Sequence, residues 1–116
     1  MSESYTDLLV WKKSMDLVVE IYHLVKQLPK EETYALSDQM RRAAVSIPSN
    51  IAEGKNRNSD KAFKQFLSIA RGSTSELETQ LLICNRIGYL SEEETELAIG
   101  LNKEVGRMLY TLMERL

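Results

Sequence analysis

The sequence predicts an all-α protein, an up-down-up-down antiparallel four-helix bundle that forms one domain over residues 1–116. Apolar residues recur every three to four positions in four separate stretches, which is the period of an amphipathic helix. The chain holds only 5 glycines and 2 prolines, too few turn-forming residues for a many-stranded sheet protein. Four such helices joined by short loops pack most simply as neighbours that alternate in direction.

The first helix is expected over residues 7–28, because Pro29 disfavours the helical conformation in the residue before it. Two apolar rows run along nearly opposite sides of this helix. We expect the first row to face the core: Leu8, Trp11, Met15, Val18, Tyr22 and Val25. A second row requires either deep burial or a partner subunit. We assign it to an oligomer interface made of Val10, Leu17, Ile21 and Leu24.

The second helix is expected over residues 36–57, with Pro48 inside it. Proline removes one backbone hydrogen bond and crowds the preceding turn, so we predict a kink near Pro48. Two short helices that meet near Ser46 are the alternative. The predicted core row consists of Leu36, Met40, Ala43, Ile47 and Ile51.

The third and fourth helices are expected over residues 60–87 and 92–115, with recognisable caps. Ser59 is a suitable N-cap and Gly88 a suitable C-cap of the third helix. Ser91 and Glu94 have the spacing of a capping box at the start of the fourth. The predicted core row of the third helix is Phe63, Leu67, Ala70, Thr74, Leu77, Leu81 and Cys84. That of the fourth is Ala98, Leu101, Val105, Met108 and Leu112.

Composition argues against an enzyme, a cofactor and a small-molecule substrate. The chain has one histidine, His23, whereas a di-iron bundle needs two Glu-x-x-His motifs. The single cysteine, Cys84, excludes an internal disulfide and a cysteine-rich zinc site, and its place on a core row predicts an inert thiol. We therefore expect no catalytic, cofactor-binding or metal-binding residues.

Composition also predicts a cytoplasmic protein that does not enter a membrane. No stretch approaches the roughly 20 apolar residues of a membrane-spanning helix. The opening MSESYTD lacks the basic and then apolar pattern of a signal peptide. Apolar residues make up 43% and charged residues 28% of the chain, a balance typical of a globular domain.

The charge is unevenly distributed, although the net charge of −2 excludes a strongly basic protein. Residues 36–72 hold seven basic and three acidic residues, a net charge of +4, while the segments on either side are acidic. We interpret these seven as a nucleic-acid or partner surface: Arg41, Arg42, Lys55, Arg57, Lys61, Lys64 and Arg71. The alternative is an ordinary solvated face. Lys61, Lys64 and Arg71 would share one side of the third helix.

Two long segments carry a specific resemblance, QMRRAAVSIPSNIAEG (residues 39–54) and FLSIARGSTSELET (residues 66–79). With LLVWKKS near the start and IGYL at residues 87–90, they resemble the four-helix-bundle family encoded in bacterial 23S ribosomal RNA intervening sequences. The resemblance spans nearly the whole chain. It departs at Ser14, where the family often has Ala, and at Ala35, where it often has Gly. The matching signature positions are Arg42, Ser46, Pro48, Asn50, Glu53, Gly54, Arg71, Gly72, Ser73 and Glu76.

The resemblance implies a bundle that commonly assembles as a homopentamer, with no established enzymatic activity, no cofactor and an open cellular role. The family is similar in architecture to the accessory protein of diversity-generating retroelements, which binds nucleic acid and a reverse transcriptase. The implied partners are thus further copies of the chain, RNA or a ribosome-associated complex, and a reverse transcriptase-like protein.

Two functional hypotheses follow from these observations. In the first, a non-enzymatic oligomeric bundle binds RNA or a ribonucleoprotein through the basic region of the second and third helices. In the second, the bundle is a protein-interaction scaffold without nucleic-acid binding. The polar stripe on the second helix leaves the same choice open between a structural role and a ligand surface. It consists of Arg42, Ser46, Asn50, Glu53 and Arg57.

Overall fold

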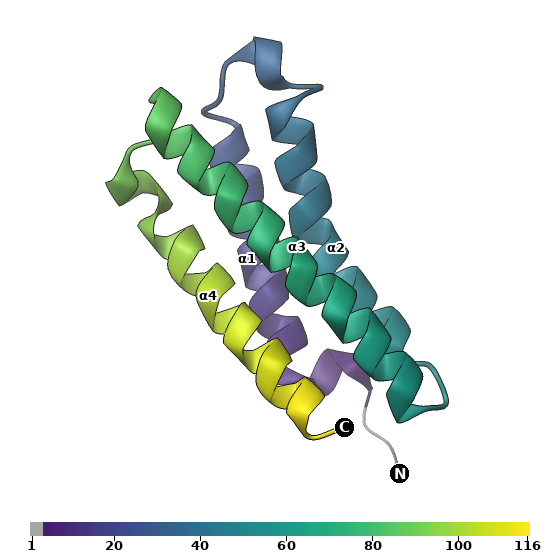
Figure 1. The fold of residues 1–116 in the computed structure, drawn as a ribbon. Coiled ribbons are helices and arrows are strands. Elements are labelled where there is room, and N and C mark those ends of the chain that lie inside the picture. Colours follow the sequence, from purple (N-terminus) through teal and green to yellow (C-terminus); the bar gives the residue numbers. More distant parts are fainter. Residues whose placement is uncertain (1–3) are drawn as a thin grey trace.

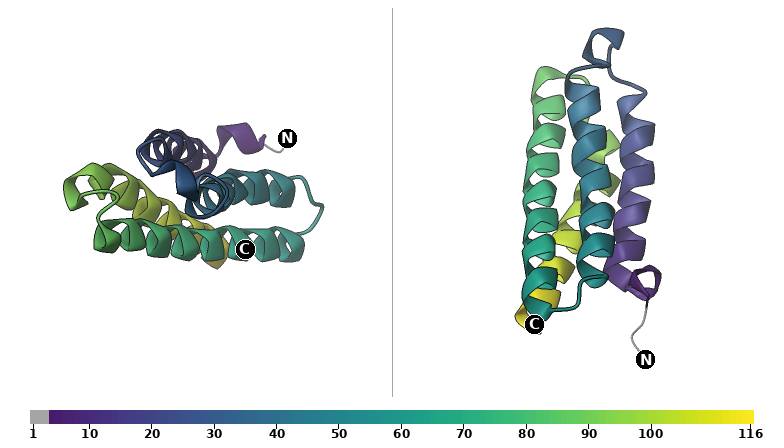
Figure 2. Two further views of the ribbon diagram at one scale, coloured as in Figure 1. Left: turned by 90° about the horizontal axis from the view of Figure 1, so that it is seen from above. Right: turned by 90° about the vertical axis from the view of Figure 1, so that its right-hand side faces the viewer.

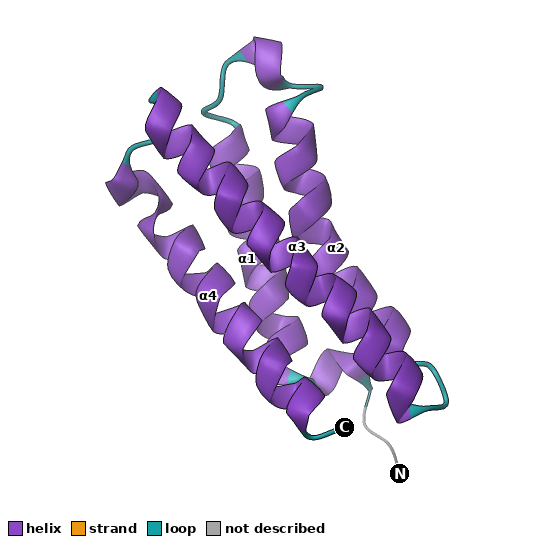
Figure 3. Ribbon diagram, viewed as in Figure 1, coloured by secondary structure: helices purple, strands orange, loops and turns teal. Residues whose placement is uncertain are grey.

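The computed structural model describes residues 4–116, and every regular element in that range is a helix (Figure 3). Met1, Ser2 and Glu3, which open the segment compared above with a signal peptide, lie outside the described residues. The four long helices are α1 (Leu9–Val25), α2 (Leu36–Lys55), α3 (Asp60–Ile87) and α4 (Glu92–Glu114). Two short 3-10 helices, η1 (Tyr5–Asp7) and η2 (Lys30–Glu32), precede α1 and α2.

The four helices form an elongated bundle of 47 × 24 × 19 Å. In Figure 1, α1 and α3 run away from the end that holds both chain termini, and α2 and α4 return to it. Helices α1 and α2 form one layer and α3 and α4 the other, as the view from above in Figure 2 shows. The α2–α3 loop therefore lies at the same end as the termini, and the other two interhelical loops lie at the opposite end.

The structure reverses the two apolar rows predicted for α1. Val10, Leu17, Ile21 and Leu24 are at most 4% exposed within the single chain, so the oligomer interface assigned to them is wrong. Within the expected core row, Val25 is buried as predicted, Leu8, Trp11 and Val18 are partly buried, and Met15 and Tyr22 are exposed. The buried row has a strict heptad spacing that includes Ser14, a polar residue that interrupts the pattern in the sequence. Its hydroxyl donates to the Trp11 carbonyl at 2.7 Å, so no polar group is left unpaired at this buried position.

Helix α2 is continuous through Pro48, which excludes the alternative of two short helices meeting near Ser46. The kink stays a prediction. Met40, Ala43, Ile47 and Ile51 are buried as expected, and Leu36 is half-buried. Small residues on this helix allow α3 to pack closely, and Gly54 is one point of close approach. A Cβ on Gly54 would lie only 2.6 Å from the Cβ of Phe66.

Local signals set the ends of α3 and α4 where the sequence predicts them. The Ser59 hydroxyl accepts from the Ala62 amide at 3.1 Å, and Gly88 ends α3 with a φ of 85°. Ser91 and Glu94 form the expected capping box of α4. All seven residues of the predicted α3 row are buried, including Cys84, and burial raises the pKa of its thiol. The inward face of α4 is centred differently, on Thr95, Ala98, Asn102, Val105 and Leu109.

Candidate nucleic-acid interface

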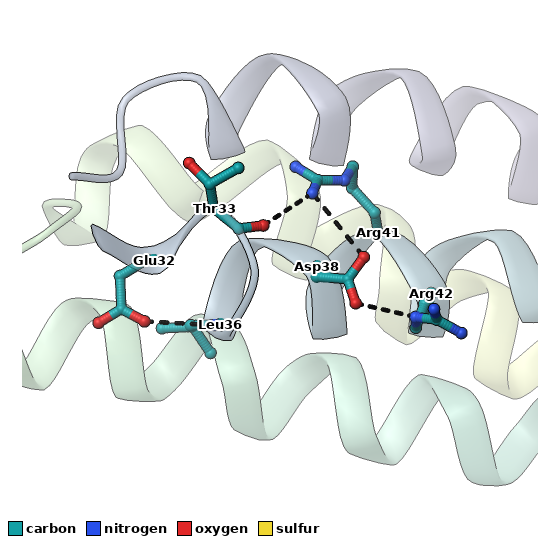
Figure 4. Close-up of polar contacts among 6 residues, drawn as sticks. All are labelled: Glu32, Thr33, Leu36, Asp38, Arg41 and Arg42. Atoms are coloured by element: carbon teal, nitrogen blue, oxygen red, sulfur yellow. Dashed lines mark hydrogen bonds and ion pairs between the residues drawn. The ribbon is translucent and has the colours of Figure 1, made fainter. Parts of the chain in front are cut away.

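The seven basic residues predicted to form one surface lie in three separate places. Arg41 and Arg42 are near the start of α2, where both approach Asp38 (Figure 4). The Arg42 Nε lies 2.9 Å from an Asp38 oxygen, and Arg41 donates to the Thr33 carbonyl at 3.0 Å. Fourteen residues separate Arg41 from Lys55, roughly 20 Å along a helix. Arg41 therefore links η2 to α2, Arg42 pairs within α2, and neither joins the other cations.

The second group, Lys55 and Arg57, surrounds the α2–α3 loop. The Arg57 guanidinium pairs with Glu53 at 2.8 Å and lies 5.1 Å from the centre of the Phe66 ring. The Lys55 ammonium lies 5.9 Å from the centre of the Phe63 ring. Cations over aromatic faces gain a modest electrostatic attraction, and Arg57 is still exposed to solvent. This group stabilises the loop while leaving positive charge at the end of the bundle.

The polar stripe of α2 has mainly structural contacts, which favours the first of its two interpretations. The Asn50 amide donates to the Ser46 carbonyl at 2.8 Å and to the Ser46 hydroxyl at 2.9 Å. The Ser73 hydroxyl of α3 donates to the same Ser46 oxygen. The signature residues Ser46, Asn50 and Ser73 thus join the two helices beside Pro48, and Glu53 pairs with Arg57. Glu76 and Gly72 are exposed on α3.

The third group, Lys61, Lys64 and Arg71, follows one stripe of α3 and borders a groove between α3 and α4. The wider part of this groove is open, with a volume of about 860 Å³. A narrower part near the chain ends shares Ser68 with it and is lined by Lys61 and Lys64. Both lysines are exposed, and neither forms an ion pair within the described part of the chain.

Helix α4 adds groove residues that sequence reasoning missed: Lys103, Arg107 and Tyr110. The available signal was their spacing of four and three, which places them on one face of a helix. It was obscured because residues 73–116 carry a net negative charge. The Arg71 guanidinium lies 4.8 Å from the centre of the Tyr110 ring, and Lys103 is 3.8 Å from Glu78. A hydrogen bond to Glu114 raises the pKa of the Tyr110 phenol above its ordinary value.

Two further kinds of site, a cluster of metal ligands and a membrane-spanning helix, are not found among residues 4–116. Across residues 4–116, no three His, Cys, Asp or Glu side chains are grouped so that they could hold a metal ion. His23 is exposed and Glu20 half-buried, as expected for a solvated helix face. None of the described helices is both long and apolar enough to cross a membrane.

Comparison with known proteins supports the family indicated by the signature segments. The model of the 23S rRNA-intervening sequence protein family matches residues 6–111. The chain belongs to this family. Among solved structures, it is similar to a protein of unknown function from the S23 ribosomal protein family of Bacteroides thetaiotaomicron. That similarity has 29% identity and a TM-score of 0.84, and covers 90% of this chain and 98% of that one. No curated protein matches the chain.

Proposed function

We propose that this member of the 23S rRNA-intervening sequence protein family is a non-enzymatic, homo-oligomeric cytoplasmic bundle that binds RNA or a ribonucleoprotein. The observation that carries the proposal is the stripe of Lys61, Lys64 and Arg71 on α3, bordering an open groove. Lys55 and Arg57 extend the positive charge around the α2–α3 loop. Each phosphate that such a cation contacts releases counterions, so affinity falls as salt rises.

Three charge reversals in that stripe test the proposal. We expect Lys61→Glu/Lys64→Glu/Arg71→Glu to abolish binding of a fluorescently labelled single-stranded RNA, measured by anisotropy across a salt series. All three side chains are exposed, so circular dichroism should show an intact fold. A matched control, Lys30→Glu/Arg42→Glu/Arg86→Glu, changes the net charge equally at exposed sites away from both the stripe and the outer face of α1. Unchanged affinity of the stripe variant, or an equal loss in the control, would show that the proposal is wrong.

A protein-interaction scaffold is the second candidate, and two observations favour it. Five of the seven cations already have a partner within the chain, Asp38, Glu53 or an aromatic ring. Helix α3 also exposes large apolar side chains, which are typical of protein contacts: Ile69, Leu82, Ile83 and Ile87. Affinity purification that recovers one protein regardless of nuclease treatment, with no bound RNA, would favour this function.

The oligomer requires a different surface from the one first assigned to it. We place the contact on the outer face of α1, where Met15, Val19 and Tyr22 are 40%, 56% and 43% exposed. Their spacing of four and three puts them on one side of the helix. Native mass spectrometry tests both the assembly and the number of five copies that the family resemblance implies.

A further inference from the structure

The floor of the α3–α4 groove contains a glycine that the bundle itself does not require. Gly72 is exposed within α3, and a Cβ added there would meet nothing within 4 Å. Glycine inside a helix is unfavourable relative to alanine, because the unfolded chain loses more conformational freedom on folding. Across the groove lies Gly106 of α4, whose added Cβ would reach Thr74 at 3.4 Å. The absence of a side chain at Gly72 lets an external molecule approach the α3 backbone, and at half-buried Gly106 it lets α4 lie close to Thr74 of α3.

Asn102, which lies between these helices, supplies an independent sign of a ligand. Asn102 is 2% exposed and lines the groove. Its side-chain amide nitrogen donates a hydrogen bond to the Thr74 carbonyl at 2.8 Å. Its Oδ1 is buried and has no hydrogen-bond donor within the described chain. A buried acceptor without a donor is unfavourable, so the site suits a ligand that brings a hydroxyl or amino group.

The charges around the groove specify a ligand that is also a polyanion. Arg71, Lys103 and Arg107 line the groove against one acidic residue, Glu78. Lys61 and Lys64 continue the positive row through the narrower part, where Asp60 is the one acidic residue. Ten residues separate Lys61 from Arg71, about 15 Å of helix, which is longer than a single phosphate group needs. Carboxylates and phosphates alone bring no donor, whereas a ribose contributes a 2′-hydroxyl.

Tyr110 and Arg71 add a surface for a nucleobase. The Tyr110 ring is 48% exposed, and the Arg71 guanidinium lies over it. Unpaired bases stack on aromatic rings and on arginine planes, while bases within a duplex are already stacked. This arrangement favours a single strand over a double helix.

We infer that one RNA strand lies along the α3–α4 groove, with its sugar–phosphate backbone over Gly72 and Gly106. Arg71 and Arg107 contact phosphates, and Asn102 accepts from a ribose hydroxyl after a small movement of the side chains that cover it. This inference rests on the proposed RNA binding and specifies where the strand lies.

Filling the groove without changing its charge tests the inference. We expect Gly72→Leu to weaken binding of a labelled single-stranded RNA about tenfold with an unchanged salt slope, since no cation is lost. Gly100→Leu is the matched control, because Gly100 is also exposed in a helix with nothing within 4 Å of an added Cβ. It lines the neighbouring groove beside Glu92, Glu93 and Glu96, and should bind like the unaltered protein. Arg107→Gln should weaken binding and reduce the slope by about one phosphate contact.

The outcomes separate this inference from the proposed function. If the α3 triple charge reversal abolishes binding but Gly72→Leu binds normally, RNA contacts the stripe and the groove inference alone is wrong. If the unaltered protein binds no RNA, both are wrong. Polyglutamate that displaces the labelled strand as well as unlabelled RNA does would assign the groove to an acidic protein segment and overturn the inference.

Discussion

Ser73 of α3 donates a hydrogen bond to the Ser46 hydroxyl of α2 across 2.9 Å. The two residues are 27 positions apart, and each belongs to one of the two signature segments. Asn50 donates to the same hydroxyl one turn along α2, beside Pro48. At this point the signature residues therefore form a polar contact between α2 and α3, in which the Ser46 hydroxyl accepts one hydrogen bond from each helix.

Removing this junction should weaken the bundle. We expect Ser73→Ala and Ser46→Ala each to lower the free energy of unfolding by about 1 kcal/mol, because each removes one partner of a partly buried hydrogen bond. Urea denaturation of both single variants and the double variant measures their coupling. The double variant should lose less than the sum of the two. Ser75→Ala, an exposed position on the same helix, is the control and should change little.

The helical glycines should respond oppositely to alanine. At Gly54 the new Cβ would lie 2.6 Å from the Cβ of Phe66 and 3.0 Å from the Phe63 ring, so the helices must move apart. We expect Gly54→Ala to destabilise by about 1–3 kcal/mol. Gly100→Ala adds a side chain in open space and should stabilise by about 0.5–1 kcal/mol. Equal effects in chemical denaturation would contradict the close packing of α2 on α3.

A glutamate should have opposite effects on the buried row and on the exposed face of α1. Leu17 is 0% exposed, so Leu17→Glu buries an unpaired carboxylate and should unfold the chain, as seen by circular dichroism. Val19 is 56% exposed, so Val19→Glu should remain folded. If the outer face of α1 joins subunits, native mass spectrometry of Val19→Glu should show monomers. A folded Leu17→Glu monomer would instead restore the interface first assigned to the inner row.

A hydrogen bond between two loops gives the protein a specific alkaline sensitivity. The Tyr89 hydroxyl donates to Glu32 at 2.8 Å, and this bond, followed by burial and the nearby carboxylate charges, raises the pKa of Tyr89. A pKa higher in the folded state than in the unfolded state favours folding while the group is protonated. The stabilisation is complete below the ordinary tyrosine pKa of 10.0 and is lost as pH rises through the higher folded value.

Tyr89→Phe isolates this contribution, since other groups also titrate at high pH. Chemical denaturation across a pH series should show the free energy of unfolding falling less steeply above pH 10.0 in the variant than in the unaltered protein. Parallel curves for the two proteins would mean that the Glu32 contact is absent in solution.

The candidate site was only partly predictable. Helical spacing predicts that Lys61, Lys64 and Arg71 share one side of α3, and in the structure they do. The prediction that Arg41 and Arg42 belong to the same surface was wrong, because net charge over a segment takes no account of the roughly 20 Å that separates the two ends of a helix. Lys103, Arg107 and Tyr110 come from a segment that is acidic as a whole, so only packing of α4 beside α3 reveals them.

The sequence by itself determined the four helices and the caps of α3 and α4, because helical periodicity and capping act within a few residues. It did not determine which side of α1 faces inward, since both rows are apolar and burial depends on what packs against each. The tertiary structure decided that question through α2 and α4, which cover Leu17 and its row and leave Val19 outside. It also built the groove from Arg71 and Arg107, which no local pattern connects, because the contact between α3 and α4 brings distant residues to one surface.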